Sequence, residues 1–368
     1  MTKHLPARPR VVAGLPVLRR RHGELQIGLD PRHATVVDGL PDTVVAAAQR
    51  LTGHRTTTDL LASLSPADRN DLAELLKTLL DQGFLEDAAG LTARDAGEAS
   101  ATAVRVLRTG NHPIERTDVG IAVHGDGRLA VTIACLLAGA GVGWVHVSAR
   151  GRVQPEDTGT GYRPEDVGKA RLVAARHAVR RVAPTVRTVP FGAAHGPDLV
   201  VLADALVPRP ENVDMLTSAA IPHLLVRTRD TVGIVGPFVV PGLTSCLRCA
   251  DLHRSDRDAC WPQLAAQLAG QAQLTDLAGT HATAAFAAAQ ALDAASWLRG
   301  GSQPPATCEV SVELDLRTAV TRHRGWSAHV ECTCGAARRR HGDWAYCAKV
   351  AANTATKLRQ SRRDGDAS

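Results

Sequence analysis

Two short cysteine couples, far apart in the chain, constrain its fold more than any other feature. They are Cys246-Leu-Arg-Cys249 and Cys332-Thr-Cys334. Each couple presents two sulfurs from one tight turn, so a metal ion bound by all four thiolates would join two distant segments. The second couple is one residue tighter than the usual spacing, but two paired couples still favour a structural zinc site. We therefore predict zinc held by Cys246, Cys249, Cys332 and Cys334.

A disulfide framework and free thiols are the competing interpretations. The chain has 8 cysteines in 368 residues, which is sparse for a disulfide-stabilised protein, and no secretory signal peptide is recognisable. Cys135 lies in an apolar helical segment and Cys308 near a strand, so both are expected in the core. His253, His281 and His329 could supplement a metal site, but four thiolates already satisfy zinc, and a structural role is expected for each of them.

Composition excludes several classes of protein. Hydrophobic residues make up 44% of the chain, enough for sizeable cores, and charged residues or glycine break each apolar stretch before the ~18 residues of a membrane span. We expect a cytoplasmic protein. The formal charge of +6 comes from scattered arginines, and the basic runs at 19–22, 338–341 and 357–363 are interpreted as solvated faces and a disordered basic tail over 351–368.

The N-terminal part has the pattern of a winged helix-turn-helix. Residues 15–37 read as a β-ribbon, helical spacing follows over 40–51, 56–64 and 65–80, and 83–86 form a closing strand. We predict a winged-helix-like peptide-recognition domain at 10–87, followed by a linker at 88–117.

Such a domain could bind DNA or a peptide, and the exposed positions of its third helix bear on the choice. They are Asp68, Arg69, Asn70, Asp71, Glu74 and Lys77. This mixed, partly acidic face argues against contact with phosphates, so no nucleic acid is expected. An edge of the ribbon could instead accept an extended peptide as an added strand.

From residue 118 the chain alternates strands and helices, among them a helix expected from about 163 to 182 and a strand expected at 185–189, which predicts a mainly parallel sheet covered on both faces. The first unit runs through a strand at 119–124, a glycine turn and an apolar helix, the order of a Rossmann-type nucleotide site. Gly125, Gly127 and Arg128 are the candidate nucleotide-binding residues. Only two of the expected glycines are present, and Ser148-Ala149 stands where a ribose site has an acidic residue, so the loop alone leaves nucleotide binding open.

The chain resembles the ThiF and MoeB class of ubiquitin-activating-enzyme-like adenylyltransferases. The resemblance rests on the loop Gly125 to Ala130, the phrase Glu165 to Arg171, the strand end Leu202-Ala-Asp204, and the cysteine couples. Residues 235–254 look like the degenerate branch of thiazole/oxazole-modified peptide pathways. The resemblance implies a Rossmann-like ThiF-type α/β domain, here at 118–350, with a structural zinc site, preceded by a winged-helix-like domain that binds a precursor's leader peptide.

Departures from the active family bear on catalysis. Active members hold Mg-ATP with an acidic residue, an Arg, a Lys and an Asp. Of these only the Asp is kept, as Asp204. The other three positions are replaced: the Lys position falls at Arg171, the Arg position near Thr158, and the acidic position at Ser148 or Ala149. Asp204 and Arg171 are the remaining catalytic candidates, and binding of ATP and magnesium is doubtful. Asp204 could equally cap the turn that follows its strand.

Three functional hypotheses follow. The first is a catalytically degenerate scaffold that binds a ribosomal peptide's leader and presents it to a separate YcaO-type cyclodehydratase, with a homodimer implied by the resemblance. The second is an active adenylyltransferase acting on a peptide or carrier-protein carboxylate, in which Cys260 could serve as a thioester nucleophile, although a packed thiol is the simpler interpretation. The third is a winged-helix regulator that uses the α/β domain as a ligand sensor.

Overall fold

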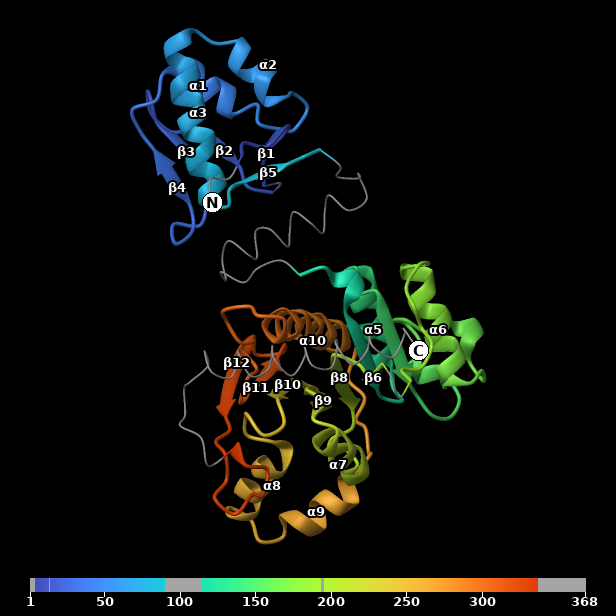
Figure 1. The fold of residues 1–368 in the computed structure, drawn as a ribbon. Helices are drawn as coiled ribbons and strands as arrows, with labels where there is room; N and C mark the ends of the chain where they lie inside the picture. The colour runs from blue at the N-terminus through green and yellow to red at the C-terminus, as the bar shows by residue number, and fades with distance from the viewer. Residues whose placement is uncertain (1–3, 13, 90–113, 193–194, 337–368) are drawn as a thin grey trace, which may run out of the picture. The chain divides into compact units, whose positions relative to one another are not determined.

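The computed structural model describes residues 4–12, 14–89, 114–192 and 195–336, which divide into two compact units at Pro113 and Ile114 (Figure 1). Most of the predicted linker, and the whole predicted tail at 351–368, lie outside the described residues. Each unit has its own hydrophobic core and is described by itself. Within the described ranges, no helix is both long and apolar enough to cross a membrane.

The N-terminal unit combines a three-stranded antiparallel sheet, three helices and a separate strand pair. The sheet runs in the order β2 (Val17–Arg19), β3 (Leu25–Ile27) and β4 (Thr35–Val37). Helices α1 (Asp42–Ala48), α2 (Thr57–Ala62) and α3 (Pro66–Asp81) follow, and β5 (Leu85–Asp87) pairs with β1 (Pro9–Val11). The ribbon, the helices and the closing strand match the sequence prediction, whereas β1 was not predicted. The name winged helix for this unit remains a prediction.

Helix α3 organises the core of this unit. Ser65 caps it by accepting a hydrogen bond from the Asp68 backbone N–H, and Pro66 occupies its first turn, where a missing N–H costs nothing. Its apolar residues recur every three or four positions and are buried together with Leu25 and Ile27 of β3. The buried residues of α3 are Leu72, Leu75, Leu76 and Leu79. The apolar stripe of α3 therefore forms one core with the central strand of the ribbon.

The C-terminal unit is built on a seven-stranded mixed sheet. The strands are β6 (Gly120–His124), β7 (Trp144–Ser148), β8 (Leu199–Asp204), β9 (His223–Arg229), β10 (Val232–Val239), β11 (Val310–Asp315) and β12 (Val320–Gly325). Their order is β12-β11-β10-β9-β8-β6-β7. Strands β7, β6, β8 and β9 are mutually parallel, and β10, β11 and β12 extend the sheet by antiparallel pairing. This confirms the predicted α/β class with a mainly parallel centre.

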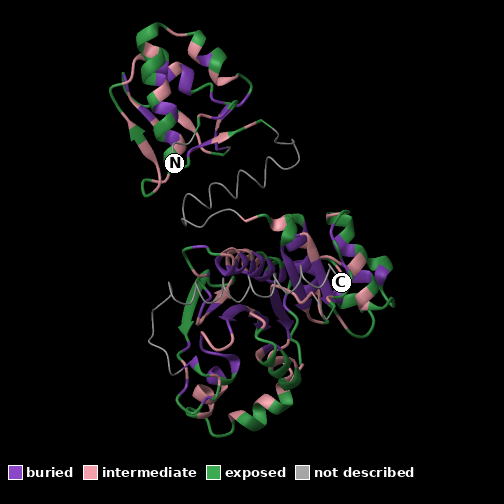
Figure 2. Ribbon diagram, viewed as in Figure 1, coloured by how far each residue is buried: buried purple, intermediate pink, exposed green. Residues whose placement is uncertain are grey.

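Helices cover this sheet on both faces (Figures 1 and 2). Along β6 and β8, Ile121, Val123 and Val201 belong to the main core, which includes residues of α5 (Arg128–Gly139), α6 (Arg171–Val182) and α10 (Leu277–Leu298). The alternate residues Ala122 and Val200 join a second cluster with residues of α7 (Pro210–Ser218) and α8 (Leu247–Ser255). The period of two along each strand therefore sorts its side chains between two helical layers. Helix α9 (Trp261–Leu268) has no buried residue.

Two predicted elements differ from the structure. The strand expected at 185–189 is reduced to a single bridge between Arg187 and Trp144, because Pro184 and Pro190 lack the N–H that a ladder needs at either end. The helix expected from residue 163 begins only at Arg171. A short 3₁₀ turn at Pro164–Asp166 precedes it, and Gly168 then adopts a left-handed backbone that interrupts a right-handed helix.

The tight packing of α10 against α5 can be tested by enlarging one residue. Ala291 is fully buried in α10, whereas Ala285 on the same helix is exposed. Leucine at position 291 would need space that a close-packed core lacks, so Ala291→Leu should lower the free energy of unfolding by about 1–3 kcal/mol in urea denaturation. Ala285→Leu should change it by less than about 0.5 kcal/mol. Equal effects of the two substitutions would contradict this packing.

Candidate functional site

The structure brings all four predicted zinc ligands into one cluster. Cys246 is the N-cap residue of α8 and Cys249 lies in its first turn, while Cys332 and Cys334 come from the segment after β12. The sulfur of Cys246 lies 3.7 Å from that of Cys249 and 3.6 Å from that of Cys332. The sulfurs of Cys249 and Cys334 are 3.6 Å apart. All four sulfurs lie within 4.8 Å of one another.

These distances fit a tetrahedral metal site and exclude a disulfide. A bonded pair of sulfurs would be ~2.05 Å apart, whereas zinc–sulfur bonds of ~2.3 Å place tetrahedral sulfurs ~3.8 Å from each other. Three of the four cysteines are buried, and the backbone N–H of His329 donates to the sulfur of Cys249. Such donation stabilises thiolate charge around a metal. The cluster could therefore hold a metal such as zinc, which would tie α8 to the segment beyond the last hairpin.

A second group of potential ligands, His253, Asp256 and His329, lies beside this cluster. Nδ1 of His329 accepts a hydrogen bond from the Glu331 backbone N–H, and its Nε2 lies 2.9 Å from an Asp256 oxygen. A neutral imidazole with this pattern carries its proton on Nε2, so neither ring nitrogen of His329 offers a lone pair to a metal. His281 lies exposed on α10. The geometry of His329 thus agrees with the structural role expected from the sequence.

The glycine turn after β6 lies against the carboxylate of Asp204. The Gly127 backbone N–H donates to Oδ2 of Asp204 at 2.9 Å, and the Ala130 N–H also donates to this carboxylate. A Cβ added at Gly125 or Gly127 would collide with the Asp204 carboxylate. Asp204 itself has a left-handed backbone with φ of 71°, which a non-glycine residue adopts only under constraint. Both glycines are therefore required by the chain's own Asp204.

The N-terminus of α5 thus already has an anion in contact with it. Backbone N–H groups at a helix N-terminus are the feature with which Rossmann-type proteins bind phosphate. Here a carboxylate that is only 8% exposed takes these donors. Burial raises the pKa of Asp204 to about 6, and the charges of Asp126 and Asp157 add to this effect, while the N–H groups of Gly127 and Ala130 oppose it.

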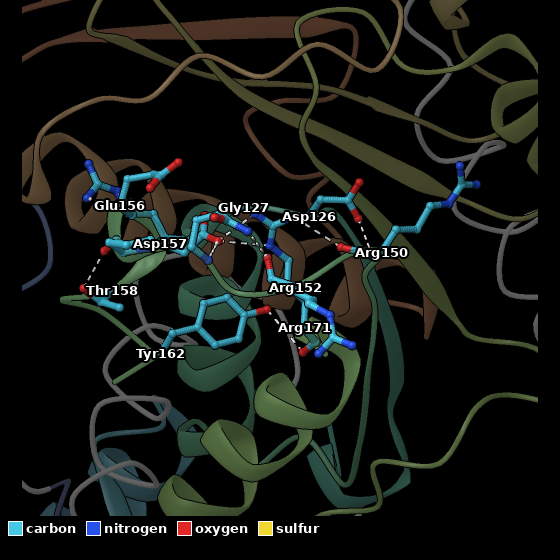
Figure 3. A network of polar contacts seen from close by, with 12 residues as sticks. Asp126, Gly127, Arg150, Arg152, Glu156, Asp157, Thr158, Tyr162 and Arg171 are labelled. Atoms are coloured by element: carbon cyan, nitrogen blue, oxygen red, sulfur yellow. Dashed lines mark hydrogen bonds and ion pairs between the residues drawn. The ribbon is translucent and has the colours of Figure 1, made fainter. Parts of the chain in front are cut away.

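Arg171, the second catalytic candidate, is engaged by an acidic partner that the sequence reasoning missed. Its Nε and Nη2 donate to Oδ2 of Asp157 at 3.0 and 2.7 Å (Figure 3). Asp157 is buried and also accepts the Gln154 backbone N–H, which closes the 3₁₀ turn Pro155–Asp157. The signal was present as Gln-Pro-Glu-Asp, a pattern of a capped turn. In this arrangement the charge of Arg171 is offset within the chain.

The other predicted positions lie around this network. Arg128 directs Nη1 to the Glu156 carbonyl at 3.3 Å, and Thr158 donates its hydroxyl to the Pro155 carbonyl. Ser148 is exposed at the end of β7 and offers a hydroxyl, not a carboxylate, at the position of a ribose partner. Gly125, Gly127, Arg128 and Asp204 are therefore brought together, whereas Arg171 pairs with Asp157.

Comparison with known proteins agrees with this geometry. The ThiF family model matches residues 112–334, and the chain belongs to the ThiF family. This confirms the expected superfamily. No curated protein sequence matches the chain.

Solved structures show the same fold at low sequence identity. E. coli MccB with ATP is similar with a TM-score of 0.62 and 13% identity, over 89% of this chain and 99% of that chain. The microcin C7 biosynthetic enzyme MccB in complex with N-formylated MccA gives a TM-score of 0.63 at 12% identity, with the same coverage of both chains. PaaA gives 0.59 at 16% identity, over 85% of this chain and 98% of that chain.

Loss of one cysteine should remove metal and fold together. We expect one zinc per purified chain by elemental analysis, and Cys246→Ser should abolish it and lower the unfolding temperature sharply, because the energy of metal binding contributes to folding. Cys260 is exposed and outside the cluster, so Cys260→Ser should keep both zinc and stability. A chain purified without metal, or a Cys246→Ser variant that retains it, would contradict this assignment.

The buried carboxylate predicts a specific pH dependence. The pKa of Asp204 is about 6 in the folded chain against an ordinary 3.8, so the folded state binds a proton that the unfolded chain has lost. This contribution to stability disappears as pH rises through about 6. Relative to Asp204→Asn, the wild type should lose about 1–2 kcal/mol of unfolding free energy between pH ~5 and ~7. If the unfolding free energies of the two proteins changed equally with pH, Asp204 would titrate normally and this prediction would be wrong.

Proposed function

We propose that the chain is a leader-peptide-binding scaffold that presents a ribosomally made precursor peptide to a YcaO-type cyclodehydratase. In this proposal the N-terminal unit holds the leader, and the ThiF-type domain keeps its fold and metal cluster but has a degenerate ATP site. The observation that carries it is the ion pair of Arg171 with the buried Asp157, because Arg171 stands at the family's lysine position and its charge is already engaged within the chain. A homodimer belongs to the proposal through the family resemblance.

The ribbon of the N-terminal unit supports a peptide-binding role. Strand β3 is central, so β2 and β4 are the edges of the sheet, and edge strands can pair with an extended peptide. The β4 edge lies beside α3, because Oγ1 of Thr35 is 3.4 Å from Oε1 of Gln82 just beyond that helix. Val36 of β4 is 46% exposed. A leader strand added at β4 would therefore meet both an exposed apolar residue and the end of α3.

The polar network of the ThiF-type domain supports the degenerate part of the proposal. Phosphoryl transfer requires cations directed at the developing charge. Arg171 is instead paired with Asp157, and Arg128 donates to a backbone carbonyl. A nucleotide would have to displace the Asp204 carboxylate from its N–H donors or bridge it with a metal ion. These contacts favour a scaffold over a catalyst.

A specific observation keeps an active adenylyltransferase as the second candidate. MccB, which shares this fold, has been solved with ATP and with AMPCPP. Asp204 stands at the end of β8 next to the glycine turn, where a carboxylate can also coordinate magnesium. Under this alternative the chain would activate a peptide or carrier-protein carboxylate.

The leader-binding role is tested on the two edges of the ribbon. Val36 on β4 and Leu18 on β2 oppose the same Gln26 on β3, so they lie on one face of the sheet, and Leu18 is 38% exposed. With a fluorescently labelled candidate leader peptide, Val36→Asp should weaken binding at least about fivefold in anisotropy titrations. The reason is that a charge would replace an apolar cross-strand contact.

Leu18→Asp is the matched control, because it places the same charge on the opposite edge. It should leave leader affinity within about twofold of the wild type. The β4 assignment is wrong if Leu18→Asp alone weakens binding. The peptide-binding role itself is wrong if the purified chain does not bind the leader.

A further inference from the structure

Within the part of the chain that the structure describes, a buried arginine outside the glycine turn has no counter-ion. Arg227 lies near the end of β9, is only 7% exposed, and has a buried Nη1 with no hydrogen-bond partner among the described residues. No ion pair joins it to a described carboxylate. An unpaired buried charge destabilises the folded protein unless a partner arrives. An orphaned guanidinium in a well-packed sheet therefore points to a missing anion.

The surroundings of Arg227 are short of negative charge. Its charged neighbours are Arg229, Arg254, Asp251 and Glu313, and Arg324 lies near Arg254. Both acidic groups already have other partners. Asp251 accepts from Arg254 at 2.7 Å and from Trp261 Nε1 at 3.1 Å, and Glu313 is contacted by Arg229 at 3.6 Å and Arg324 at 3.7 Å. Among the described residues around Arg227, four guanidinium groups thus share two carboxylates.

The electrostatic consequence is visible on Arg227 itself. Burial, together with the positive charges of Arg254 and Arg229, lowers the pKa of Arg227 to about 9. Arg254 cannot move away easily, since its guanidinium stacks between the rings of Trp261 at 5.0 Å and Trp326 at 4.7 Å. The arginines are therefore held close to one another in spite of their repulsion.

The position of Arg227 is one at which α/β sheets bind ligands. It pairs in register with Asp204 across β8 and β9, at the carboxyl end of both strands. Asp204 is a neighbouring carboxylate, yet it turns toward Gly127 and forms no ion pair with Arg227. The ends of β8 and β9 thus place the Asp204 carboxylate, bound to the glycine turn, and the Arg227 guanidinium on neighbouring strands.

The segment that covers this edge is lightly packed. Residues 269–273 are hydrogen-bonded to Leu206 and Val207 after β8 and to Thr228 of β9. Trp261, at the start of α9, contacts Asp251 and Arg254. No residue of α9 is buried, and Leu264 on it is 44% exposed. Few buried side chains therefore anchor α9, so local opening of this helix is expected to cost little.

We propose that Arg227 forms the base of an anion site that binds the carboxylates of an acidic peptide segment. A planar carboxylate matches the guanidinium fork. Because the arginines around Arg227 outnumber the acidic groups by two, the site favours a ligand with two adjacent carboxylates over one with a single carboxylate. The site lies in the ThiF-type unit and does not depend on the leader-binding role proposed for the N-terminal unit.

The test titrates the full-length zinc-loaded protein with N-acetyl-triglutamate, succinate and inorganic phosphate in a calorimeter. Triglutamate should bind the wild type, and Arg227→Met should bind it at least tenfold more weakly, because the cation at the base of the site is gone. Arg317 lies exposed in the turn between β11 and β12, outside the cluster. Arg317→Met removes the same charge from the surface and should leave affinity unchanged.

Four outcomes of this titration overturn the proposal. No binding of triglutamate to the wild type, or equal binding by Arg227→Met, removes the site. Succinate binding as tightly as triglutamate would assign it to small free carboxylates, and phosphate binding without either carboxylate would exclude a carboxylate ligand. If Arg227→Met does not fold, Arg227→Lys replaces it, since lysine keeps the charge but lacks the fork; an affinity lowered about threefold or more supports the site, and an unchanged affinity contradicts it.

Discussion

The contact between the Asp204 carboxylate and the glycine turn is the constraint on which the account of this ThiF-family chain depends. It joins the end of β8 to the turn between β6 and α5, holds Asp204 in a left-handed backbone, and leaves no room for side chains at Gly125 and Gly127. A turn suited to binding phosphate therefore has an anion of the chain itself against its N–H groups. The contact with Asp204 therefore explains why both positions are glycine.

A second constraint acts on the opposite layer of the same sheet. The alternate residues of β6 and β8 pack with α7 and α8, and this cluster includes Cys246, Cys249 and Cys332. A metal held by the cysteines would fix α8 and the segment after β12 against that face. Helix α9, which follows α8, lacks such anchoring. The ThiF-type domain thus combines a helical layer that shares a buried cluster with the cysteines and a helix, α9, without buried residues.

Local patterns were sufficient to predict most elements and the cysteine cluster from the sequence. The leucine spacing of α3 predicts a helix and the spacing within each cysteine couple predicts a pair of metal ligands, since helical period and ligand spacing are local properties. The ion pair of Arg171 with Asp157 and the isolation of Arg227 could not be predicted in this way. They depend on which strands become neighbours and which side chains are excluded from water. The prediction of a full strand at 185–189 was wrong because the flanking prolines lack the N–H groups that a ladder needs. The prolines were visible in the sequence, but the strand prediction gave more weight to the β-forming residues between them.

The measurement that tests the central claim most directly is calorimetric titration of the zinc-loaded protein with Mg-ATP. An occupied glycine turn and an Arg171 already paired with Asp157 leave little to hold phosphates, so we predict no binding heat up to millimolar nucleotide. Saturable binding in the micromolar range would contradict the account. It would show that Asp204 yields its N–H donors to phosphate, and that the chain retains a working nucleotide site.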